Sequence, residues 1–575
     1  MTALRPPGLG PIIGHTTDKT CRLWIQAGDL DDPSGPLGLG GRTVGVIGLL
    51  RKTRKSVLKA YYFRLQREYD RTGTFVLGLD VALGRHENDR QDALRLDIPF
   101  ALDTPYSLEP DTEYCARMAT LTLDDPMPDD AALSDVELAM RLPLIANIQS
   151  MLLDLRPEEC EVVFKTFPPS GVIQPSLAFL LGSCRYPGLL WKVKEADRIF
   201  APMRAYLPHG NGPTDDARFT LMVGDQIYAD TLNRFVPLGR ADTYEEFQER
   251  YKTAFRSPNM RELLRSAPTY MILDDHEIED NWTQDRVADT GKHAIFNYAI
   301  GAYMSYQWSH GPRSYGRLLY YRFDCAGYPF FVLDARTQRF KDCEKGLAEN
   351  HLLGKPTIDP VHRSQLRVLL DWLTEQQASG GNVPKFVACA SVFAPNGMSE
   401  RIESDVESGR RLLESNIEHR KKSDSWPAFP KTRRAILDHI VAGGIQNVIF
   451  LTGDIHCSNI ARLTFPAPTK GNEMVAYDIT SSAFYWPFPF ADGDPNGYVH
   501  DSKLPEQQDG FPIANGEMHY TAWAFTQEDN FCRIEIDQAG RRLSVTYYDR
   551  KGDVIEVAEA SGERLATNRL SLAPW

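Results

Sequence analysis

Short runs in which apolar and polar residues alternate occupy the first 168 residues of the chain. The runs lie at residues 21–26, 61–65, 74–77, 113–118 and 162–167. An alternation with a period of two is typical of a strand that buries one of its faces. The pattern therefore predicts that the N-terminal part of the chain is built from β-strands.

One local motif indicates which β fold this is. The spacing Leu108-x-Pro110-x-Thr112-x-Tyr114 resembles the tyrosine corner of immunoglobulin-like and fibronectin-like domains. A generic turn before a strand would use the same residues, so the motif alone does not decide the fold. Together with the strand pattern it predicts a β-sandwich over residues 1–168.

A helical insertion is predicted inside this sandwich, at about residues 123–158. An acidic, Pro-rich stretch leads into a capping box formed by Ser134 and Glu137, and a helical pattern continues through Leu153. The sequence Pro-Pro-Ser-Gly at 168–171 is typical of a linker and is expected to end the domain.

After this linker the apolar runs are short and nearly continuous. They lie at residues 177–181, 219–223, 270–273, 329–333, 386–390 and 448–451. Runs of this kind indicate strands that are buried on both faces, as in a parallel sheet. The second part of the chain is therefore expected to contain a sheet with covered faces.

Helix signals stand between these runs. A capping box at 243–246 begins one helix, and Ser-Pro at 257–258 begins another. Residues 364–377 are amphipathic, and both this segment and residues 432–441 are followed by a pair of glycines. Alternating strands and helices predict a layered α/β domain over residues 169–575.

Five of the predicted strands are followed by side chains that can do chemistry. In chain order the strand ends carry Gly182-Ser-Cys184-Arg185, Gly224-Asp225-Gln-Ile-Tyr228, Asp274-Asp275-His276-Glu277 with Asn281, Asp334-Ala-Arg336, and Gly453-Asp454-Ile-His456. Ligands of α/β sheets bind outside the carboxyl ends of the strands. We therefore expect these groups to meet in one region.

The carboxylates decide what this region binds. A single Asp after a strand is usually a turn or cap residue, and a single Cys there is usually a buried apolar group. However, Asp225, Asp274, Asp275 and Asp454 together would repel one another in a dry site unless a cation compensated their charge. Jointly they predict a metal site with more than one ion.

The types of donor favour two different kinds of metal. Carboxylates and Asn suit hard cations such as Ca²⁺, Mg²⁺ and Mn²⁺, whereas thiolate, phenolate and imidazole suit a transition metal, with Fe³⁺ as the first candidate and Zn²⁺ as the second. Asp225 is the candidate to bridge two ions.

Paired ions of this kind activate water for in-line attack at phosphorus. His276 and either Arg336 or Arg185 are candidates to contact the phosphate oxygens.

Charge and cysteine content narrow the choice of cellular compartment and of binding partners. The net charge of −13 disfavours non-specific binding to nucleic acid or to an anionic membrane. The nine cysteines are an odd number without a CxxC pair, as expected of free thiols in a reducing compartment. No signal-peptide pattern and no membrane-spanning apolar run is visible. These features predict a cytoplasmic protein with no nucleic-acid or membrane partner.

Taken in order, six motifs resemble one known family. GSCRYPG, GDQIYAD, DDHEIEDNW, LDART, SDSWPAFPKTRR and GDIHCSN are similar to the motifs of the PhoD-like alkaline phosphatases, a branch of the calcineurin-type metallophosphoesterases. The resemblance covers most of residues 176–485. It implies a four-layer α/β/β/α catalytic domain preceded by an immunoglobulin/fibronectin-like sandwich, with Fe³⁺ and Ca²⁺ as metals and a small phosphate ester as substrate.

The resemblance also implies a ligand set. Cys184, Asp225, Tyr228 and His456 would hold iron, and Asp225, Asn281 and Asp454 would hold calcium, with Asp275 as a further ligand. His276 stands where the broader superfamily has a histidine that contacts phosphate. Members of the family are typically exported, which this chain does not match, so Zn²⁺, Mn²⁺ or Mg²⁺ are possible substitutes.

Two alternatives to a phosphatase or phosphodiesterase remain open. The same motifs are compatible with phospholipase D-like or phosphotriester-cleaving activity. A protein of another class, a non-catalytic metal-binding scaffold acting through its β-sandwich, is disfavoured by the complete motif set. Two segments have undecided roles: the charged stretch 399–425 is a solvated helix or a lid, and the aromatic stretch 484–490 lines the substrate entrance or packs the layers.

Overall fold

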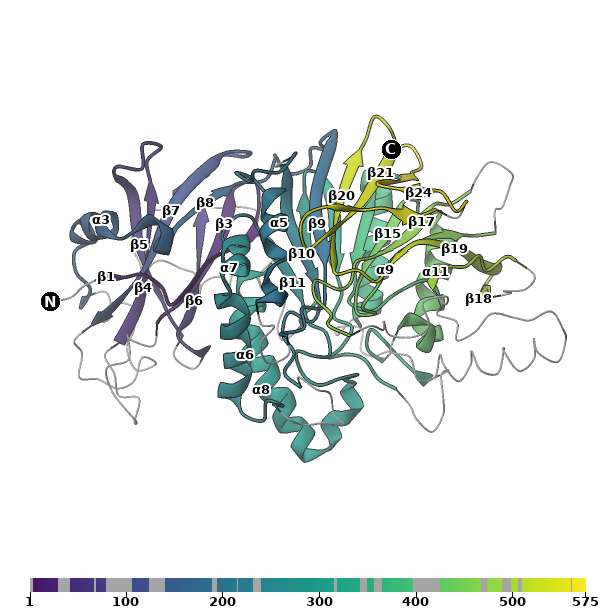
Figure 1. The fold of residues 1–575 in the computed structure, drawn as a ribbon, viewed down its shortest axis with the longest axis horizontal. Coiled ribbons are helices and arrows are strands. Elements are labelled where there is room, and N and C mark those ends of the chain that lie inside the picture. The colour runs from purple at the N-terminus through teal and green to yellow at the C-terminus, as the bar shows by residue number, and fades with distance from the viewer. Residues whose placement is uncertain are drawn as a thin grey trace.

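A computed structural model describes most of the chain (Figure 1). The described residues are 4–28, 42–66, 69–78, 106–123, 140–188, 194–214, 216–230, 239–314, 318–341, 349–355, 364–396, 425–466, 473–488, 498–504, 509–559 and 561–575. The charged stretch 399–425 lies outside them except for its last residue, as do the capping box at 134–137 and Cys343. The other eight cysteines are buried free thiols.

Two antiparallel sheets form the N-terminal end of the molecule. One contains β1 (Leu4–Arg5), β4 (Arg42–Leu50), β5 (Val57–Arg64), β7 (Glu113–Leu123) and β8 (Glu161–Lys165), and the other contains β2 (Leu9–Thr16), β3 (Thr20–Gln26) and β6 (Thr72–Gly78). Ile13, Leu23 and Phe75 of the smaller sheet share one apolar core with Ile47 and Met118 of the larger sheet. The alternating runs of the sequence therefore predicted real strands.

The predicted tyrosine-corner contact is present. The hydroxyl oxygen of Tyr114 accepts a hydrogen bond of 2.8 Å from the main-chain N–H of Glu109. The helical insertion is shorter than expected over its described part, because α3 (Ile145–Asp154) begins only after Pro143. Proline disfavours a helical conformation of the residue before it, which accounts for the later start. The four-residue α4 (Pro157–Cys160) follows.

Two larger sheets form the rest of the molecule. The first contains β9 (Ser176–Gly182), β10 (Ala217–Val223), β11 (Thr269–Ile272), β20 (Asn530–Asp537), β21 (Arg542–Asp549), β22 (Val554–Ile555) and β25 (Asn568–Ser571). The second contains β12 (Tyr321–Cys325), β13 (Tyr328–Val332), β14 (Lys385–Ala388), β15 (Val448–Thr452), β16 (Ser458–Thr464), β17 (Ala476–Thr480), β18 (Phe511–Ile513) and β19 (Gly516–Thr526). A short hairpin joins β23 (Val557–Ala558) and β24 (Arg564–Leu565).

Parallel strands form one side of the first sheet and the centre of the second. β9, β10 and β11 run parallel in the first sheet, and β13, β14, β15 and β17 run parallel in the second. These strands include all six apolar runs predicted from the sequence. The strands added by the C-terminal part of the chain, such as β20 and β19, pair antiparallel.

The two sheets pack on each other through aromatic side chains. The rings of Phe179 and Phe219 from the first sheet lie 5.5 Å and 5.3 Å from Phe330 of the second, measured between centroids. Helices α5 (Phe200–Ala205), α6 (Tyr244–Arg256), α7 (Pro258–Leu264) and α8 (Thr290–Tyr306) share a core with the first sheet. Helices α9 (Gln365–Gly380) and α11 (Pro430–Gly443) share a core with the second. The mixed α/β prediction is confirmed.

The predicted helix caps are confirmed, although α9 and α11 extend beyond the predicted 364–377 and 432–441. Thr243 and Glu246 form a complete capping box at α6, and Pro258 is the first residue of α7. Ser364 caps α9 at its start and Gly381 follows its last residue, whereas α11 is followed by Gly444, which has a φ of 57°. A positive φ of this kind stops a helix and is least costly for glycine.

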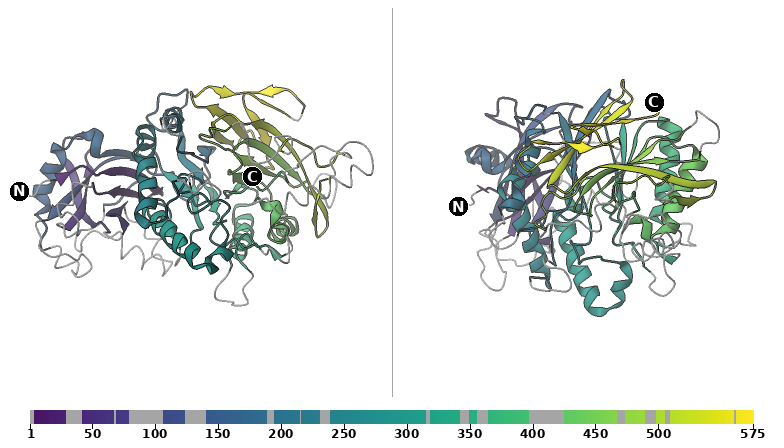
Figure 2. Two further views of the ribbon diagram at one scale, coloured as in Figure 1. Left: turned by 60° about the horizontal axis from the view of Figure 1, so that its bottom comes forward. Right: turned by 45° about the vertical axis from the view of Figure 1, so that its right-hand side comes forward.

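The N-terminal sheets contact the helices that cover the first large sheet (Figures 1 and 2). Leu9, Ile12 and Trp24 belong to the same apolar core as α6, α7 and α8. The indole N–H of Trp24 donates a 2.9 Å hydrogen bond to the carbonyl of Ser305. Among the described residues, no helix is long and apolar enough to cross a membrane.

Candidate metal centre

Four strand ends bring the candidate ligands together. Cys184 follows β9, Asp225 follows β10, Asp274 and Asp275 follow β11, and Asp454 and His456 follow β15. Three of these strands belong to the first large sheet and β15 belongs to the second. The cluster therefore lies where the carboxyl ends of parallel strands in the two facing sheets come together.

Three groups of side chains could each hold a metal ion. They are Cys184 with Asp225 and His456; Asp225 with Asp275 and His276; and Asp225 with Asp274, Asp275 and Asp454. In each group, one potential ligand atom per residue lies within 4.8 Å of the others. Asp225 belongs to all three groups, which is the position a bridging carboxylate would occupy.

The backbone at these residues is in an unusual conformation. Five candidate ligands have a positive φ: Cys184 (57°), Asp225 (56°), Asn281 (54°), Asp454 (73°) and His456 (52°). For a residue with a side chain, this region costs about 1–2 kcal/mol. Such strain persists where the surrounding structure holds it, and it concentrates at functional sites.

Glycines let the strand ends approach closely. A Cβ atom at Gly224, whose φ is +100°, would lie 2.5 Å from the Cβ of Asp274. A Cβ atom at Gly453 would lie 2.3 Å from the hydroxyl oxygen of Ser183. Larger residues at these two positions would push the carboxylate-bearing turns apart.

Tyr228 lies between two candidate ligands. Its hydroxyl donates to Oδ2 of Asp225 over 3.2 Å and lies 3.3 Å from Nε2 of His456. The Cys184 thiol lies on the same side of Asp225, in the group with His456. The structure thus brings together the thiol, phenol and imidazole that the sequence singled out.

Burial disfavours the charged forms of the ionisable side chains in this cluster. It raises the pKa values of Cys184, Asp225 and Tyr228 well above their usual values, and the negative charges of neighbouring groups raise them further. Burial and the charge of Asp275 also raise the pKa of Asp274 to about 6, although Arg336 acts in the opposite direction. A bound cation would favour the deprotonated ligands, because it compensates their charge.

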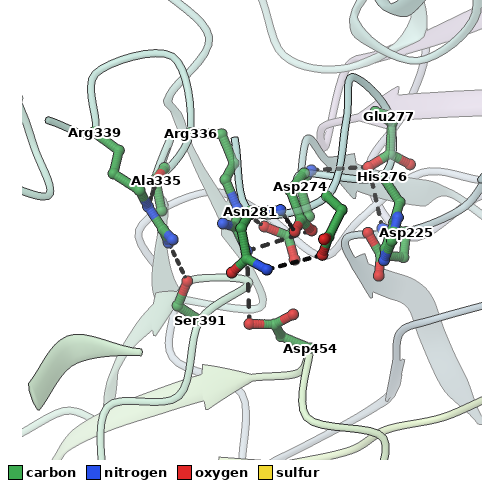
Figure 3. Close-up of polar contacts among 12 residues, drawn as sticks. Asp225, Asp274, His276, Glu277, Asn281, Ala335, Arg336, Arg339, Ser391 and Asp454 are labelled. Carbon is green, nitrogen blue, oxygen red and sulfur yellow. Dashed lines mark hydrogen bonds and ion pairs between the residues drawn. The ribbon is translucent and has the colours of Figure 1, made fainter. Parts of the chain in front are cut away.

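Arg336 supplies positive charge at the centre of the carboxylates (Figure 3). The fully buried guanidinium donates through Nε to Asp274, and its Nη2 lies 3.4 Å from Asp275 and 3.6 Å from Asp454. Asp334 holds the turn that carries this arginine by accepting the main-chain N–H of Arg336 over 3.1 Å. Arg336 therefore lies among these carboxylates, and its contact with a phosphate stays a prediction.

His276 is paired with a second buried carboxylate, Asp230. Its Nδ1 lies 2.7 Å from Oδ1 of Asp230, and its ring stacks on Tyr228 with centroids 4.3 Å apart. Burial lowers the pKa of His276, but the charges of Asp230, Asp225 and Asp275 outweigh burial and raise it well above its usual value. Since Nδ1 is engaged, Nε2 is the atom oriented for another ligand.

The remaining two predicted residues differ in their placement. The main-chain N–H of Asn281 donates to Asp275, and its side-chain nitrogen donates to Asp280 over 2.8 Å (Figure 3). The buried guanidinium of Arg185 instead donates 3.1 Å to the hydroxyl of Ser257 and lies over the ring of Phe200. These contacts direct the Arg185 side chain toward the helices that cover the sheet.

The sequence interpretation assigned no role to Glu277 or Asp230. The Glu277 carboxylate accepts main-chain N–H groups from Asp225, Gln226, Ile227 and Asp274. Asp230 accepts the main-chain N–H of Asp280 in addition to pairing with His276. Both residues stand in the quoted motifs, but only the fold shows that they face the turns rather than solvent.

The aromatic stretch after β17 packs against this cluster. Trp486 stacks on His456 with centroids 3.5 Å apart and an interplanar angle of 7°. Phe484 packs on Phe200, at a centroid distance of 5.4 Å. Part of the stretch thus packs in the core and part contacts a candidate ligand, and residues 489 and 490 lie outside the described residues.

Comparison with known proteins places this architecture in a family. The family model described as PhoD-like phosphatase matches residues 199–526, which is more than half of the chain. The chain belongs to the PhoD-like phosphatase family. Alkaline phosphatase D of Bacillus subtilis (strain 168) is 24% identical over 338 residues, or 55% of this chain. The match spans about half of that relative, 53% of its length.

The solved structure titled "Structure of PhoD" has a similar fold. It matches with a TM-score of 0.60 and 15% identity, over 98% of this chain and 92% of that chain. The PhoD-like match at 199–526 contains Asp225, His276, Arg336 and His456, whereas Cys184 lies before it. The structure nevertheless joins Cys184 to the PhoD-like part of the chain through its group with Asp225 and His456.

Proposed function

We propose that this protein is a metal-dependent phosphoester hydrolase of the alkaline phosphatase or phosphodiesterase type. The observation that carries the proposal is the central place of Asp225 in all three groups of possible ligands. Membership of a family of phosphatases supports the choice of phosphoester as the bond that is cleaved. The proposed substrate is a small-molecule phosphate ester.

The residues present suit a metal centre. Oδ1 of Asp225 and Oδ2 of Asp274 are buried without a hydrogen-bond partner among the described residues. Buried carboxylate oxygens are normally satisfied, so these atoms are available for ions. By family resemblance we assign Cys184, Asp225, Tyr228 and His456 to Fe³⁺. We assign Asp225, Asn281 and Asp454, with Asp275, to Ca²⁺. Zn²⁺, Mn²⁺ or Mg²⁺ are substitutes.

The chain's own residues would act around the phosphoryl group. Bound cations would supply Lewis acidity, which activates water and withdraws charge from the phosphate oxygens. His276, held by Asp230 through Nδ1, would present Nε2 to a phosphate oxygen. Arg336 would share its Nη2 donors between the carboxylates and that phosphate. Arg185 would have to leave Ser257 to contribute, so the two arginines are best tested separately.

Replacing the shared carboxylate tests the proposal. We expect Asp225→Asn to lower hydrolysis of p-nitrophenyl phosphate or bis-p-nitrophenyl phosphate at least about a hundredfold, because the variant loses charge where the ions meet. Circular dichroism should remain unchanged. The control is Asp242→Asn, since Asp242 pairs at the surface with Arg240 and should leave turnover intact.

The outcomes separate the alternatives. Elemental analysis of the purified protein identifies the metals that are bound. Wild-type protein that binds metal but hydrolyses neither ester would contradict the proposal and favour the scaffold alternative. Preference for a phospholipid or a phosphotriester over both aryl esters would indicate the phospholipase D-like or phosphotriester-cleaving alternative.

The finer organisation of the chain is part of the same proposal. The two large sheets and their helices would form the four-layer α/β/β/α domain at 169–575. Residues 1–168 would form the immunoglobulin/fibronectin-like sandwich with its insertion at 123–158. A cytoplasmic location without nucleic-acid or membrane partners is also proposed, and cell fractionation would test it.

A further inference from the structure

Glu277 connects the two turns that carry the central carboxylates. It is fully buried directly after His276. Its Oε1 accepts the main-chain N–H groups of Gln226 (2.7 Å) and Ile227 (3.3 Å). Its Oε2 accepts those of Asp225 (3.1 Å) and Asp274 (2.8 Å). One carboxylate therefore bridges the turn after β10 and the turn after β11.

Among the described residues, the hydrogen-bond donors to Glu277 are all amide groups. Besides the four main-chain donors, Nε2 of Gln307 lies 3.3 Å from Oε1. Hydrogen bonds from several N–H groups to one buried side chain fix the relative positions of their donors, and here their lengths are 2.7–3.3 Å. Because both oxygens bind two main-chain groups each, neither turn can shift without breaking a bond to the other.

The residue held most directly is the proposed bridging ligand. Asp225 has a φ of 56°, and the N–H that this conformation exposes is one of the four bound by Glu277. Asp274 is bound in the same way and precedes Asp275, a second member of the acidic group. The separation of the Asp225 and Asp274–Asp275 carboxylates thus depends on the side chain of Glu277. Glu277 itself is not placed to coordinate an ion, because both of its oxygens already accept main-chain hydrogen bonds.

We propose that Glu277 is a positioning residue that sets the affinity of the centre for cations. This inference rests on the proposed function, and it deepens it by naming the group that preorganises the ligands. Residues that orient metal ligands contribute about 10–100-fold to metal affinity. Glu277 would do so through the main chain of Asp225 and Asp274.

The isosteric variant Glu277→Gln tests this directly. Its amide nitrogen cannot accept, so two of the four N–H groups would face a donor, and both turns would relax apart. We expect the Kd for Mn²⁺ to rise about 10–100-fold, measured on metal-free protein from the electron paramagnetic resonance signal of free Mn²⁺. Turnover should recover when Mn²⁺ is raised to saturation. An affinity within about twofold of wild type would overturn the inference.

Two further variants complete the experiment. Glu246→Gln is the matched control, because Glu246 also accepts two main-chain N–H groups, from Asp242 (2.7 Å) and Thr243 (3.2 Å), but at the start of α6. Its affinity for Mn²⁺ should equal that of wild type. Gln307→Met removes a single donor to Glu277. If Glu277→Gln does not fold, this variant tests whether Glu277 sets the affinity for cations. We expect its Kd to rise about threefold, and an unchanged Kd would contradict the inference.

The two proposals fail in different ways. If wild-type protein bound no Mn²⁺, Zn²⁺, Ca²⁺ or iron, the proposed function itself would be wrong. If wild type and Glu277→Gln bound Mn²⁺ equally well, the metal centre would stand and only the role of Glu277 would be rejected.

Discussion

At the scale of single residues, the centre combines buried charge of both signs. Arg336 contacts Asp274, Asp275 and Asp454 with no exposed surface of its own. In the absence of ions it is the main compensation for these carboxylates. Metal binding and Arg336 therefore stabilise the same group of negative charges.

This leads to a prediction for Arg336→Met. Removing one partner of a buried ionic cluster costs about 3 kcal/mol or more, because the remaining charges are left uncompensated. We expect the free energy of unfolding of the metal-free protein to fall by that amount, and the loss to be smaller when Mn²⁺ is bound. Urea unfolding with and without chelator would measure both values.

The control is an exposed arginine. Arg322 on β12 lies 3.9 Å from Glu375 and its side chain is 48% exposed, so Arg322→Met should change stability little. An equal loss for Arg336→Met with and without Mn²⁺ would mean that the arginine and the cations do not share the same carboxylates.

How far residues could be predicted from sequence depended on whether their role was local. Asp225, Asp454 and His456 could be named because each follows a strand and the carboxyl ends of parallel strands converge. Glu277 could not, because its partners are main-chain groups brought close by the neighbouring strand. Arg185 shows the converse: its motif indicates the site, but its long side chain turns toward Ser257.

At the scale of elements, the parallel strands were predictable and most antiparallel additions were not. A strand covered on both faces, such as β15, is an uninterrupted apolar run. β19 alternates buried and partly exposed residues, and its pairing with β16 joins segments far apart in sequence. Sequence periodicity carries no information on such distant pairing.

β17 contains a buried carboxyl group that links three elements. Oδ2 of Asp478 accepts the N–H groups of Phe393 (2.9 Å) and Ala394 (2.8 Å) after β14, and Oδ1 accepts the hydroxyl of Thr452 (2.8 Å) on β15. Burial raises its pKa from 3.8 to about 7, although these hydrogen bonds act in the opposite direction.

The raised pKa of Asp478 predicts how stability depends on pH. The unfolded chain releases the proton near its ordinary pKa of 3.8, whereas the folded protein keeps it up to about pH 7. The contribution to stability is therefore complete below the unfolded pKa and is lost as the pH rises to about 7.

Asp478→Asn should abolish this dependence, because Asn keeps one acceptor for the two N–H groups and can donate to Thr452. We expect the variant to exceed wild type by up to about 4 kcal/mol at pH 8, measured by urea unfolding between pH 4 and pH 8. The exposed Asp553→Asn serves as control. Identical pH profiles for wild type and Asp478→Asn would contradict the prediction.

At the scale of the whole molecule, the N-terminal sheets and the rest of the chain share a core. Trp24 is fully buried against Tyr306, with ring centroids 5.7 Å apart, and donates to Ser305. Across the same boundary, Asp70 lies 2.9 Å from Lys252 and accepts the hydroxyl of Tyr306. The sequence predicted two units but contained no signal of this contact, because neither side's pattern shows which apolar residues face another unit.

We therefore expect the molecule to unfold as one cooperative system. Trp24→Ala should destabilise it by about 4 kcal/mol through the cavity that is left, and should shift a single calorimetric transition. Loss of turnover should follow the same transition. Tyr69→Ala, at a residue that is 46% exposed, is the control and should shift it little. Two transitions, with only one displaced by Trp24→Ala, would show that the units are independent.

The left-handed backbone at the centre has a consequence for how the protein can evolve. Cys184, Asp225, Asn281, Asp454 and His456 all hold conformations that glycine adopts more easily. Replacing any of them by glycine would relieve local strain while removing a ligand, so the heat resistance of the metal-free protein and metal binding are in conflict at these positions. Selection for thermostability alone, without a requirement for turnover, should therefore enrich glycine at these positions and erase the site before it disturbs the fold.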